Sequence, residues 1–473
     1  MTQIKFGTSG WRGILAEDFT FEHVKIVTQA IADSLRSQGL GDSGVVVGYD
    51  ARFMGYRFAG ETARVLAGAG IKAFLCDRDT PTPVIAHEIL RRKADGGINF
   101  TASHNPYDYN GLKFSPAWGG PALPETTRDI EERANAMLGE FCYRELPLEA
   151  GRNQGLIEDI DPCAEYCATL RKIIDLPAIG RAGLRIAVNP MYGTGRGYLD
   201  KLLAEAGVDI VVVNDHADPY FGGLPPEPAE ANIQDFIALV KGDPKISLGV
   251  ATDGDADRYG ILDADGSYIE PNYLLALLAD YLVRYKGEQG AVARSVATSH
   301  FLDAVARHHQ LVVLETPVGF KFIGEYIRDN RIAIGGEESA GLTVRGHVPD
   351  KDGILACLLV AEMVAVTGKT LKEQLSDLYA RVGEFYTRRI NLRLTPEVAT
   401  AYAAKFDQQP QDFAGLKVLE TVTIDGNKFL LENDAWVLFR KSGTEPVVRV
   451  YGEARQPDTL EKILRAAEQY VLA

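Results

Sequence analysis

Cysteine and long apolar runs are both scarce in this sequence of 473 residues. The cysteines are Cys76, Cys142, Cys163, Cys167 and Cys357. Because they are odd in number and mostly scattered, they argue against a disulfide framework. No stretch approaches the ~20 apolar residues that span a bilayer, and the start, MTQIKFGTSGWRG, lacks the apolar segment of a signal peptide. We therefore expect a cytoplasmic protein with no membrane partner.

Positive charge is scarce as well. The chain has 50 Lys and Arg residues against 65 Asp and Glu residues, which gives a formal net charge of -15 at pH 7. A protein that binds nucleic acid needs a basic face to neutralise phosphates. We therefore expect no nucleic-acid partner, although an anionic small molecule would still bind where cations gather locally.

Strand-like and helix-like segments alternate along most of the chain. Hydrophobic residues make up 46% of it, and the length is sufficient for three or four domains. The first examples are a helical pattern over 21–38, an apolar run over 44–50 and a second helical pattern over 58–70. Such alternation predicts α/β layer domains. From residue 386 onwards the pattern changes to several strand-like runs and a closing helix, which predicts an antiparallel sheet with helices on one side.

Several strand-like runs end in a polar loop, which is where α/β folds place their ligands. These loops are TASHNP (101–106), TDGDADR (252–258), GGEESAG (335–341) and RKSGTEP (440–446). The segment GTGRG (193–197) also follows a strand-like run, but it lacks the G-x-G-x-x-G spacing of a dinucleotide-binding loop. We expect it only to begin a helix.

The second loop has the composition of a metal site. Asp253, Asp255 and Asp257 alternate with the small residues Gly254 and Ala256, so the backbone can fold tightly and the carboxylates can converge. Like charges ~4 Å apart repel by about 4 kcal/mol at an effective dielectric constant of about 20, so a bound cation is the natural resolution. Ligands that are all oxygen, and few in number, favour a magnesium ion (Mg²⁺) over Ca²⁺.

Two other interpretations apply to the same loop. An EF-hand also begins D-x-D-x-D-G, but here Arg258 stands at the glycine position and Ala264 at the position of the bidentate glutamate. That interpretation fails. A solvated acidic turn is the remaining alternative, and the buried-looking strand before the loop argues against it.

The last two loops indicate anion and sugar binding. In RKSGTEP, Arg440 offers a planar fork, Ser442 and Thr444 offer hydroxyls, and Gly443 lets backbone N–H groups approach, which together suit a phosphate. In GGEESAG, the acceptors of Glu337 and Ser339 suit sugar hydroxyls. An ordinary hairpin turn and a glycine-bounded turn are the respective alternatives.

Taken together, the motifs resemble those of the α-D-phosphohexomutase superfamily, which comprises phosphoglucomutases and phosphomannomutases. FGTSGWRG, TASHNP, DGDADR, GEESAG and RKSGTEP occur here in the order and approximate spacing of that family, over almost the whole chain. The resemblance implies an α/β protein of four domains around a central cleft: three related mixed α/β sandwich domains and a C-terminal α+β domain like the TATA-binding protein. The implied domains are 1–150 with a phosphoserine loop, 151–265 with a metal-binding loop, 266–375 with a sugar-binding loop and 376–473 with a phosphate-binding loop.

The resemblance also implies a reaction. Ser103 would carry a phosphate and pass it to the free hydroxyl of a hexose phosphate, and glucose 1,6-bisphosphate would be the intermediate and activator. Return of the other phosphate to Ser103 shifts the phosphate between positions 1 and 6. One Mg²⁺ on Asp253, Asp255, Asp257 and an oxygen on Ser103 would neutralise the transferring group.

Further roles follow from the family's motifs, position by position. The residues that would line the phosphoserine site are Arg12, His104, Lys113 and Arg258. Lys113 is a candidate general acid or base, provided that its pKa is depressed. The residues that would bind the sugar and the phosphate that is not reacting are Thr316, Gly319, Glu337, Ser339, Lys351, Arg440, Ser442, Gly443 and Thr444.

The sugar loop bears on the choice of hexose. GEESAG resembles the loop of glucose-directed members, whereas glucosamine-directed members usually have GEQSGH and many dual mannose/glucose enzymes have GEMSGH. Position 338 is Glu here and no histidine follows Gly341, which favours glucose phosphate. A dual phosphomannomutase and a phosphoglucosamine mutase are the alternatives, and the expected enzyme is a monomer or a homodimer.

Two other classes of protein stay open at this point. A Mg²⁺-dependent sugar phosphatase would pass the phosphate to water, but phosphatases with a D-x-D nucleophile use the aspartate itself, and here the aspartates are far along the chain from TASHNP. A non-catalytic sugar-phosphate sensor would have no need of Ser103, Lys113 and all three aspartates.

Overall fold

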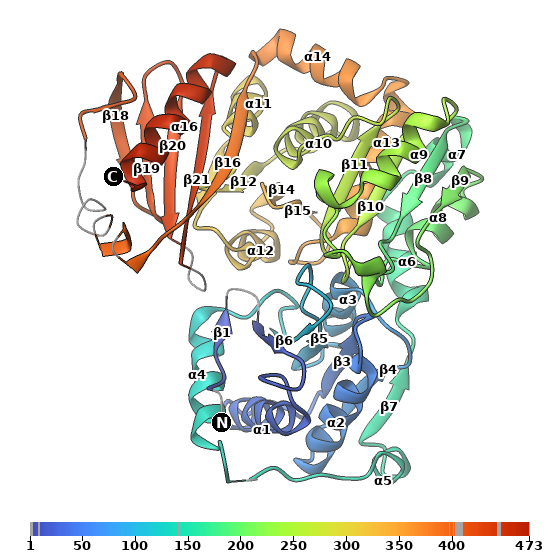
Figure 1. Ribbon diagram of the computed structural model, residues 1–473. Coiled ribbons are helices and arrows are strands. Elements are labelled where there is room, and N and C mark those ends of the chain that lie inside the picture. The colour runs from blue at the N-terminus through green and yellow to red at the C-terminus, as the bar shows by residue number, and fades with distance from the viewer. Residues whose placement is uncertain are drawn as a thin grey trace.

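The computed structural model describes residues 3–7, 10–140, 142–396, 398–400, 402, 410–441 and 446–472. The strands form separate sheets of seven, four, four and six strands in chain order. In Figure 1 the blue N-terminal unit lies at the bottom, the green and yellow units lie to the right and centre, and the red C-terminal unit lies at the upper left.

The first sheet has the order β1-β2-β6-β5-β3-β4-β7 and mixes parallel and antiparallel pairs. Its strands are β1 (Phe6–Gly7), β2 (Gly10–Ile14), β3 (Val45–Tyr49), β4 (Ala73–Cys76), β5 (Gly96–Phe100), β6 (Tyr109–Pro116) and β7 (Ile157–Ile160). The helices of this unit are α1 (Phe21–Ser37), α2 (Gly55–Gly68), α3 (Thr82–Arg92), α4 (Pro124–Ala136) and α5 (Leu148–Asn153). β7 pairs in parallel with β4, so the first sheet reaches Ile160 rather than stopping at the expected boundary of 150.

Local sequence explains the start of this unit. Thr20 caps α1 by accepting a hydrogen bond from the backbone N–H of His23, which satisfies one of the free N–H groups of the first turn. The next strand, β3, consists mostly of valine, and its first four residues are buried. Strands that are buried on both faces are typical of parallel sheets covered by helices.

The second and third sheets share one plan, a parallel core with an antiparallel edge strand. Their strands are β8 (Arg185–Asn189), β9 (Asp209–Val212), β10 (Leu248–Thr252), β11 (Tyr259–Asp263), β12 (Ala291–Ser295), β13 (Val313–Thr316), β14 (Ile332–Glu337) and β15 (Gly341–Val344). The helices around them are α6 (Cys163–Ile173), α7 (Leu176–Arg181), α8 (Leu199–Glu205), η1 (Phe221–Gly223), η2 (Glu230–Asn232), α9 (Gln234–Gly242), α10 (Pro271–Lys286), α11 (Phe301–His308), α12 (Phe320–Arg328), α13 (Gly353–Thr367) and α14 (Leu371–Val382).

One continuous apolar core joins these two units. It includes residues of α6, α8 and β10 together with residues of α10, α11 and α13. α13 is apolar on all sides and almost entirely buried, as expected for a helix without a polar face. Within the described part of the chain, no single helix has the length and apolar character needed to cross a membrane. α13 and α14 meet that test only as a pair, and they are bent by 78°.

The fourth unit is the antiparallel sheet expected from the sequence. Its order is β16-β21-β20-β19-β18-β17, and α16 (Pro457–Leu472) packs on it (Figure 1). The strands are β16 (Tyr386–Arg393), β17 (Asp412–Phe413), β18 (Leu416–Val422), β19 (Asn427–Leu431), β20 (Trp436–Lys441) and β21 (Val447–Ala454). The predicted α/β fold of four units with a C-terminal α+β unit is confirmed.

Candidate active site

The loop that contains Ser103 joins β5 to β6. These strands pair in antiparallel fashion, with Asn99 opposite Lys113, so Lys113 returns beside the loop. Ser103 is buried and has a φ of 52°, in the left-handed region that non-glycine residues rarely adopt. Its N–H donates to Thr101 Oγ1 over 2.8 Å. Its hydroxyl donates to Asp253 Oδ2 over 3.1 Å, so the first unit meets the second at this serine.

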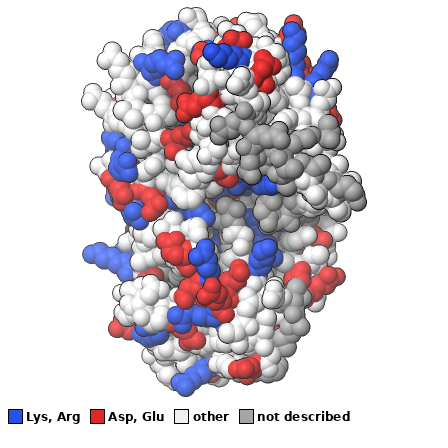
Figure 2. Space-filling view, turned by 90° about the vertical axis from the view of Figure 1, so that its left-hand side faces the viewer, with Lys and Arg blue, Asp and Glu red and all other residues white. Residues whose placement is uncertain are grey.

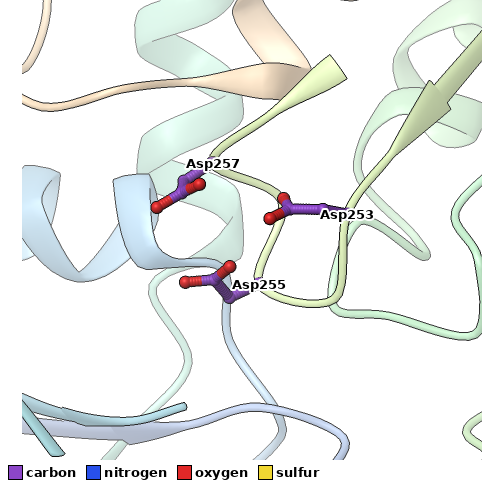
Figure 3. A group of neighbouring side chains, drawn as sticks. All are labelled: Asp253, Asp255 and Asp257. Carbon is purple, nitrogen blue, oxygen red and sulfur yellow. The ribbon is translucent and has the colours of Figure 1, made fainter. Parts of the chain in front are cut away.

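The three aspartates lie in the turn between β10 and β11 and are all buried. Their ligand oxygens lie within 4.8 Å of one another, and their carboxylates face a common space (Figure 3). Among the residues that the structure describes, Asp255 Oδ1 and Asp257 Oδ1 have no hydrogen-bond partner. Burial, with repulsion from Asp255 and Asp257, raises the pKa of Asp253 well above its ordinary value. Converging oxygens with free lone pairs fit a hard divalent cation such as Mg²⁺.

Lysine side chains already neutralise part of this cluster. Lys113 Nζ lies 2.6 Å from Asp255 Oδ2 and 3.0 Å from Asp257 Oδ2, and Lys351 Nζ lies 2.9 Å from Asp257 Oδ2. Burial lowers the pKa of Lys113, but the two aspartates outweigh burial and hold that pKa above its ordinary value. The depressed pKa that a neutral lysine base requires is therefore not found in this structure. Lys113 acts here as a positive charge against the carboxylates.

We expect Lys113→Met to destabilise the metal-free protein by about 3 kcal/mol, because removing one partner of a buried ion pair leaves the other charge unpaired. Added Mg²⁺ restores most of that loss, since the cation supplies the missing charge. Thermal unfolding in EDTA and in Mg²⁺ measures both effects. Lys72→Met is the matched control, because Lys72 pairs with Glu158 at the surface, and its loss costs at most about 1 kcal/mol. Equal stability of Lys113→Met and the wild type in EDTA would contradict this account.

Two arginines and a histidine surround the serine loop. Arg12, on β2, donates from Nη1 to Asn105 Oδ1 over 2.6 Å. The backbone N–H of Arg258 donates to Asp253 Oδ1 over 2.9 Å, and its Nη1 donates to Glu227 Oε1 over 2.9 Å. Burial, together with the charges of Arg258 and Arg12, lowers the pKa of His104, so the imidazole is neutral. The positive charge available to a phosphate here comes from the arginines and lysines.

The sugar-loop candidates gather at the carboxyl ends of β13 and β14. Glu337 ends β14 and is buried, and its Oε1 accepts the N–H of Gly319 over 2.8 Å. Gly319 immediately precedes α12, and its φ of 130° requires glycine. Thr316 ends β13 and is also buried, and Ser339 lies in the turn after Glu337. Because β12 pairs in parallel with both β13 and β14, these residues lie along one edge of the sheet.

Glu337 provides a pH test. Burial, with repulsion from Glu338, raises its pKa to about 7, while Lys351 and Arg258 act in the opposite direction. Below that pH the carboxyl is protonated and loses acceptor capacity, so we expect kcat/KM to fall about tenfold per pH unit as the pH drops below 7. A profile of kcat/KM against pH, measured with the hexose phosphate that gives the highest rate, shows this acidic limb.

Two neighbouring variants separate Glu337 from the titration of the substrate's own phosphate. Glu337→Gln removes the limb that Glu337 causes. Glu338→Gln removes the repulsion and moves the midpoint of the limb to lower pH. An identical midpoint in the wild type, Glu337→Gln and Glu338→Gln would show that another group titrates.

The fourth predicted loop is described only in part. Arg440 lies on β20 and donates from Nε to Asp425 Oδ2 over 2.8 Å. The same oxygen accepts the N–H of Val318 over 3.0 Å, so Asp425 joins the C-terminal unit to the loop that contains Gly319. The remaining predicted phosphate ligands, Ser442, Gly443 and Thr444, lie outside the described residues.

Sequence reasoning missed several polar partners at this site. Asp425 and Glu227 each bind a predicted arginine, and Thr82 Oγ1 donates to Asp255 Oδ2 over 2.5 Å. None of them lies in the quoted motifs, and a local signal was present only for Thr82, which follows a strand and opens α3. The GTGRG segment was expected only to begin a helix, but α8 begins later, at Leu199. The N–H of Thr194 in this segment donates to the Gly254 carbonyl over 3.0 Å. That segment supports the aspartate turn.

Known protein families match the chain in the same four parts. The models described as phosphoglucomutase/phosphomannomutase alpha/beta/alpha domains I, II and III match residues 3–138, 164–266 and 270–382. The model described as the phosphoglucomutase/phosphomannomutase C-terminal domain matches residues 390–469.

Relatives match over nearly their whole length. A phosphoglucomutase/phosphomannomutase of Thermococcus kodakarensis is 32% identical over 464 residues, which cover 97% of this chain and 96% of that protein. A phosphoglucomutase of Komagataeibacter xylinus is 30% identical over 487 residues, covering 96% of this chain and 87% of that protein. A crystal structure from Thermus thermophilus, provisionally named a phosphomannomutase, is 34% identical with a TM-score of 0.87 and covers 100% of both chains.

The order of the four matched units is that of a phosphohexomutase, the class that the sequence motifs predicted. With relatives of this similarity over its full length, the chain belongs to the phosphoglucomutase/phosphomannomutase family.

Proposed function

We propose that this enzyme interconverts glucose 1-phosphate and glucose 6-phosphate through a phosphate carried on Ser103. The observation that supports this most directly is the 3.1 Å contact between the Ser103 hydroxyl and Asp253 in a buried site. This contact places a serine with a left-handed backbone conformation next to three carboxylates that could hold a cation. Glucose 1,6-bisphosphate is the proposed intermediate and activator.

The protein's own residues would divide the work as follows. Arg12, Lys113 and Arg258 offset the charge of the phosphate on Ser103, because buried cations near a transferring phosphoryl group stabilise its negative charge. His104, being neutral, lines the phosphate without adding charge. Asp253, Asp255 and Asp257 would hold Mg²⁺, which when bound supplies further neutralisation of the phosphoryl oxygens.

Binding of the sugar falls to the other two units in this proposal. Glu337 and Ser339 accept the sugar's hydroxyls, with Lys351 beside them, and Thr316 and Gly319 contact the sugar from the neighbouring loop. The phosphate that is not reacting binds through Arg440, Ser442, Gly443 and Thr444. Two separate phosphate positions are needed, because the bisphosphate must turn over so that each of its phosphates meets Ser103 once.

The preference for glucose rests on the sugar loop. Relatives of similar identity are named for glucose, mannose and glucosamine alike, so the relatives leave the hexose open. Glu338 is fixed by the hydroxyls of Ser295 and Thr298, over 3.2 and 3.3 Å. It therefore places a carboxylate next to Glu337, and the surrounding GEESAG sequence is that of glucose-directed members. A cytoplasmic location and a monomeric or homodimeric state remain predictions.

Rates on the 1-phosphates of glucose, mannose and glucosamine, with a trace of the matching bisphosphate as primer, test the proposal. We expect glucose 1-phosphate to give the highest kcat/KM, with mannose 1-phosphate second. A strong preference for either other sugar would overturn the choice of hexose. Steady release of inorganic phosphate would support a phosphatase instead, and no turnover with any primed sugar would support a sensor.

A further inference from the structure

Arg52 is a buried arginine that contacts the Ser103 loop and lies outside the motifs discussed so far. It follows β3, whose last residue, Tyr49, pairs with Phe100 at the end of β5. The segments that leave the two parallel strands therefore begin side by side, and the N–H of Asp50 donates to the Phe100 carbonyl over 2.8 Å. This register brings the Arg52 side chain directly beneath the loop that begins at residue 101.

The guanidinium of Arg52 is surrounded by the carbonyl groups of that loop. Nη2 donates to the carbonyls of Ser103 and Asn105 over 2.7 and 2.5 Å. Nη1 donates to the carbonyls of Pro106 and Tyr109 over 2.6 and 3.0 Å. The loop is thus wrapped around one planar cation, with its carbonyls pointing inward.

The remaining donor anchors the arginine itself. Nε donates to Asp50 Oδ2 over 3.1 Å, and neither side chain has any exposed surface. The ring of Phe221, from the second unit, covers the guanidinium at 5.0 Å, a cation–π contact. All five N–H donors of an arginine are therefore used, so Arg52 has none left for a substrate phosphate. In this respect it differs from Arg12 and Arg258.

We propose that Arg52 is a positioning residue that sets the conformation of the Ser103 loop without touching the substrate. Four carbonyls that point toward one another repel and lose their hydrogen bonds unless a cation lies between them. Holding the carbonyls of Ser103 and of the residues after it restrains the backbone of the loop at Ser103, whose φ lies in the left-handed region, and so directs its hydroxyl toward Asp253. A lysine keeps the charge but has only three donors and no planar fork, so it cannot hold the four carbonyls at once.

The test is Arg52→Lys in the full-length enzyme. This inference rests on the proposed mutase function. We expect kcat for glucose 1-phosphate to fall about 100-fold, the effect of a misplacement of about 1 Å, while KM stays within about twofold because the sugar-binding residues are unchanged. The fraction of protein that carries phosphate on Ser103 after incubation with the bisphosphate, read by intact mass, falls in parallel.

Arg36→Lys is the matched control. Arg36 also holds loop carbonyls, those of Leu40 and Gly70 over 3.3 and 2.8 Å, but at the surface of the same unit. We expect it to leave both kcat and the phosphate on Ser103 unchanged. If Arg52→Lys does not fold, Asp50→Asn, which removes the negative charge beside the guanidinium and keeps the size of the side chain, is read in the same way with a smaller expected loss.

The outcomes separate the two claims. Wild-type enzyme that does not interconvert hexose phosphates contradicts the proposed function. Active wild-type enzyme together with a folded Arg52→Lys, or Asp50→Asn, of unchanged kcat contradicts the positioning role alone. A rise in KM at unchanged kcat also contradicts it, because that result would place Arg52 in substrate binding.

Discussion

Replacing Ser103 by alanine is expected to lower kcat by at least about 10⁴-fold, the scale seen when a covalent nucleophile is removed. The hydroxyl is the only group in the proposed reaction that both receives and returns the phosphate, so neither Lys113 nor His104 can substitute for it. The measurement is the rate of glucose 6-phosphate formation from glucose 1-phosphate. Intact mass of the purified protein checks, in parallel, whether the added phosphate is lost.

The folded state should survive this change. Ser103 donates one side-chain hydrogen bond, to an aspartate whose pKa is already raised, so the melting temperature stays close to that of the wild type. Ser115→Ala is the matched control, because Ser115 lies on β6 in the same hairpin, and we expect full activity. Substantial turnover by Ser103→Ala would exclude Ser103 as the phosphate carrier.

The second large effect concerns the aspartate turn. Asp255→Asn should lower kcat by about a thousandfold, because losing a metal ligand removes about 4 kcal/mol of charge stabilisation. Treatment with EDTA should abolish wild-type activity, and Mg²⁺ should restore it. Because metal binding requires ionised carboxylates, and Asp253 has a raised pKa, the Mg²⁺ concentration for half-activity should increase as the pH falls.

Asp265→Asn distinguishes a metal ligand from a general acidic surface. Asp265 lies close to the same turn in sequence but is exposed, paired with Lys372 over 2.5 Å. We expect it to leave both activity and the Mg²⁺ requirement unchanged. Full activity of the wild type in EDTA, or a weak effect of Asp255→Asn at every Mg²⁺ concentration, would contradict the metal site.

The candidate site residues that could be predicted from the sequence alone are those with a local sequence signal. Ser103 and the three aspartates each follow an apolar strand directly, and strand ends in α/β folds are where polar side chains gather. Two observations pointed to the same class of enzyme. These residue types are the ones that phosphoryl transfer needs, and five ordered motifs resemble those of one superfamily. The class of enzyme could therefore be predicted before any coordinates.

Long-range pairing could not be predicted in the same way. β7 lies after the expected boundary at 150 yet completes the first sheet beside β4, and a short strand of four residues carries no signal of its partner. Asp425 illustrates the same limit, since its role depends on Arg440 and Val318, which lie in different units. Arg52 binds main-chain carbonyls, which every residue has. The hydrogen-bond partners of Arg52 could therefore not be predicted from a pattern of side chains.

The local electrostatic environment of each ionisable side chain was the other property that could not be predicted from the sequence. A role for Lys113 as general acid or base would require a depressed pKa, whereas in the structure Asp255 and Asp257 lie beside its ammonium group and raise that pKa. Amino-acid composition is a poor guide to the local electrostatic potential. On the face drawn in Figure 2, positive and negative side chains are interspersed, although the net charge of the chain is negative. Only the three-dimensional arrangement shows which charges meet.

A single-turnover experiment tests the central claim most directly. Enzyme that carries phosphate on Ser103 is mixed with glucose 1-phosphate and Mg²⁺, and protein mass and sugar phosphates are followed together. We predict that the protein transiently loses one phosphate from Ser103 as glucose 1,6-bisphosphate appears in equal amount, and regains one phosphate as glucose 6-phosphate forms. Loss of that phosphate as inorganic phosphate, or formation of glucose 6-phosphate in the first turnover with neither unphosphorylated enzyme nor bisphosphate as an intermediate, would contradict the account.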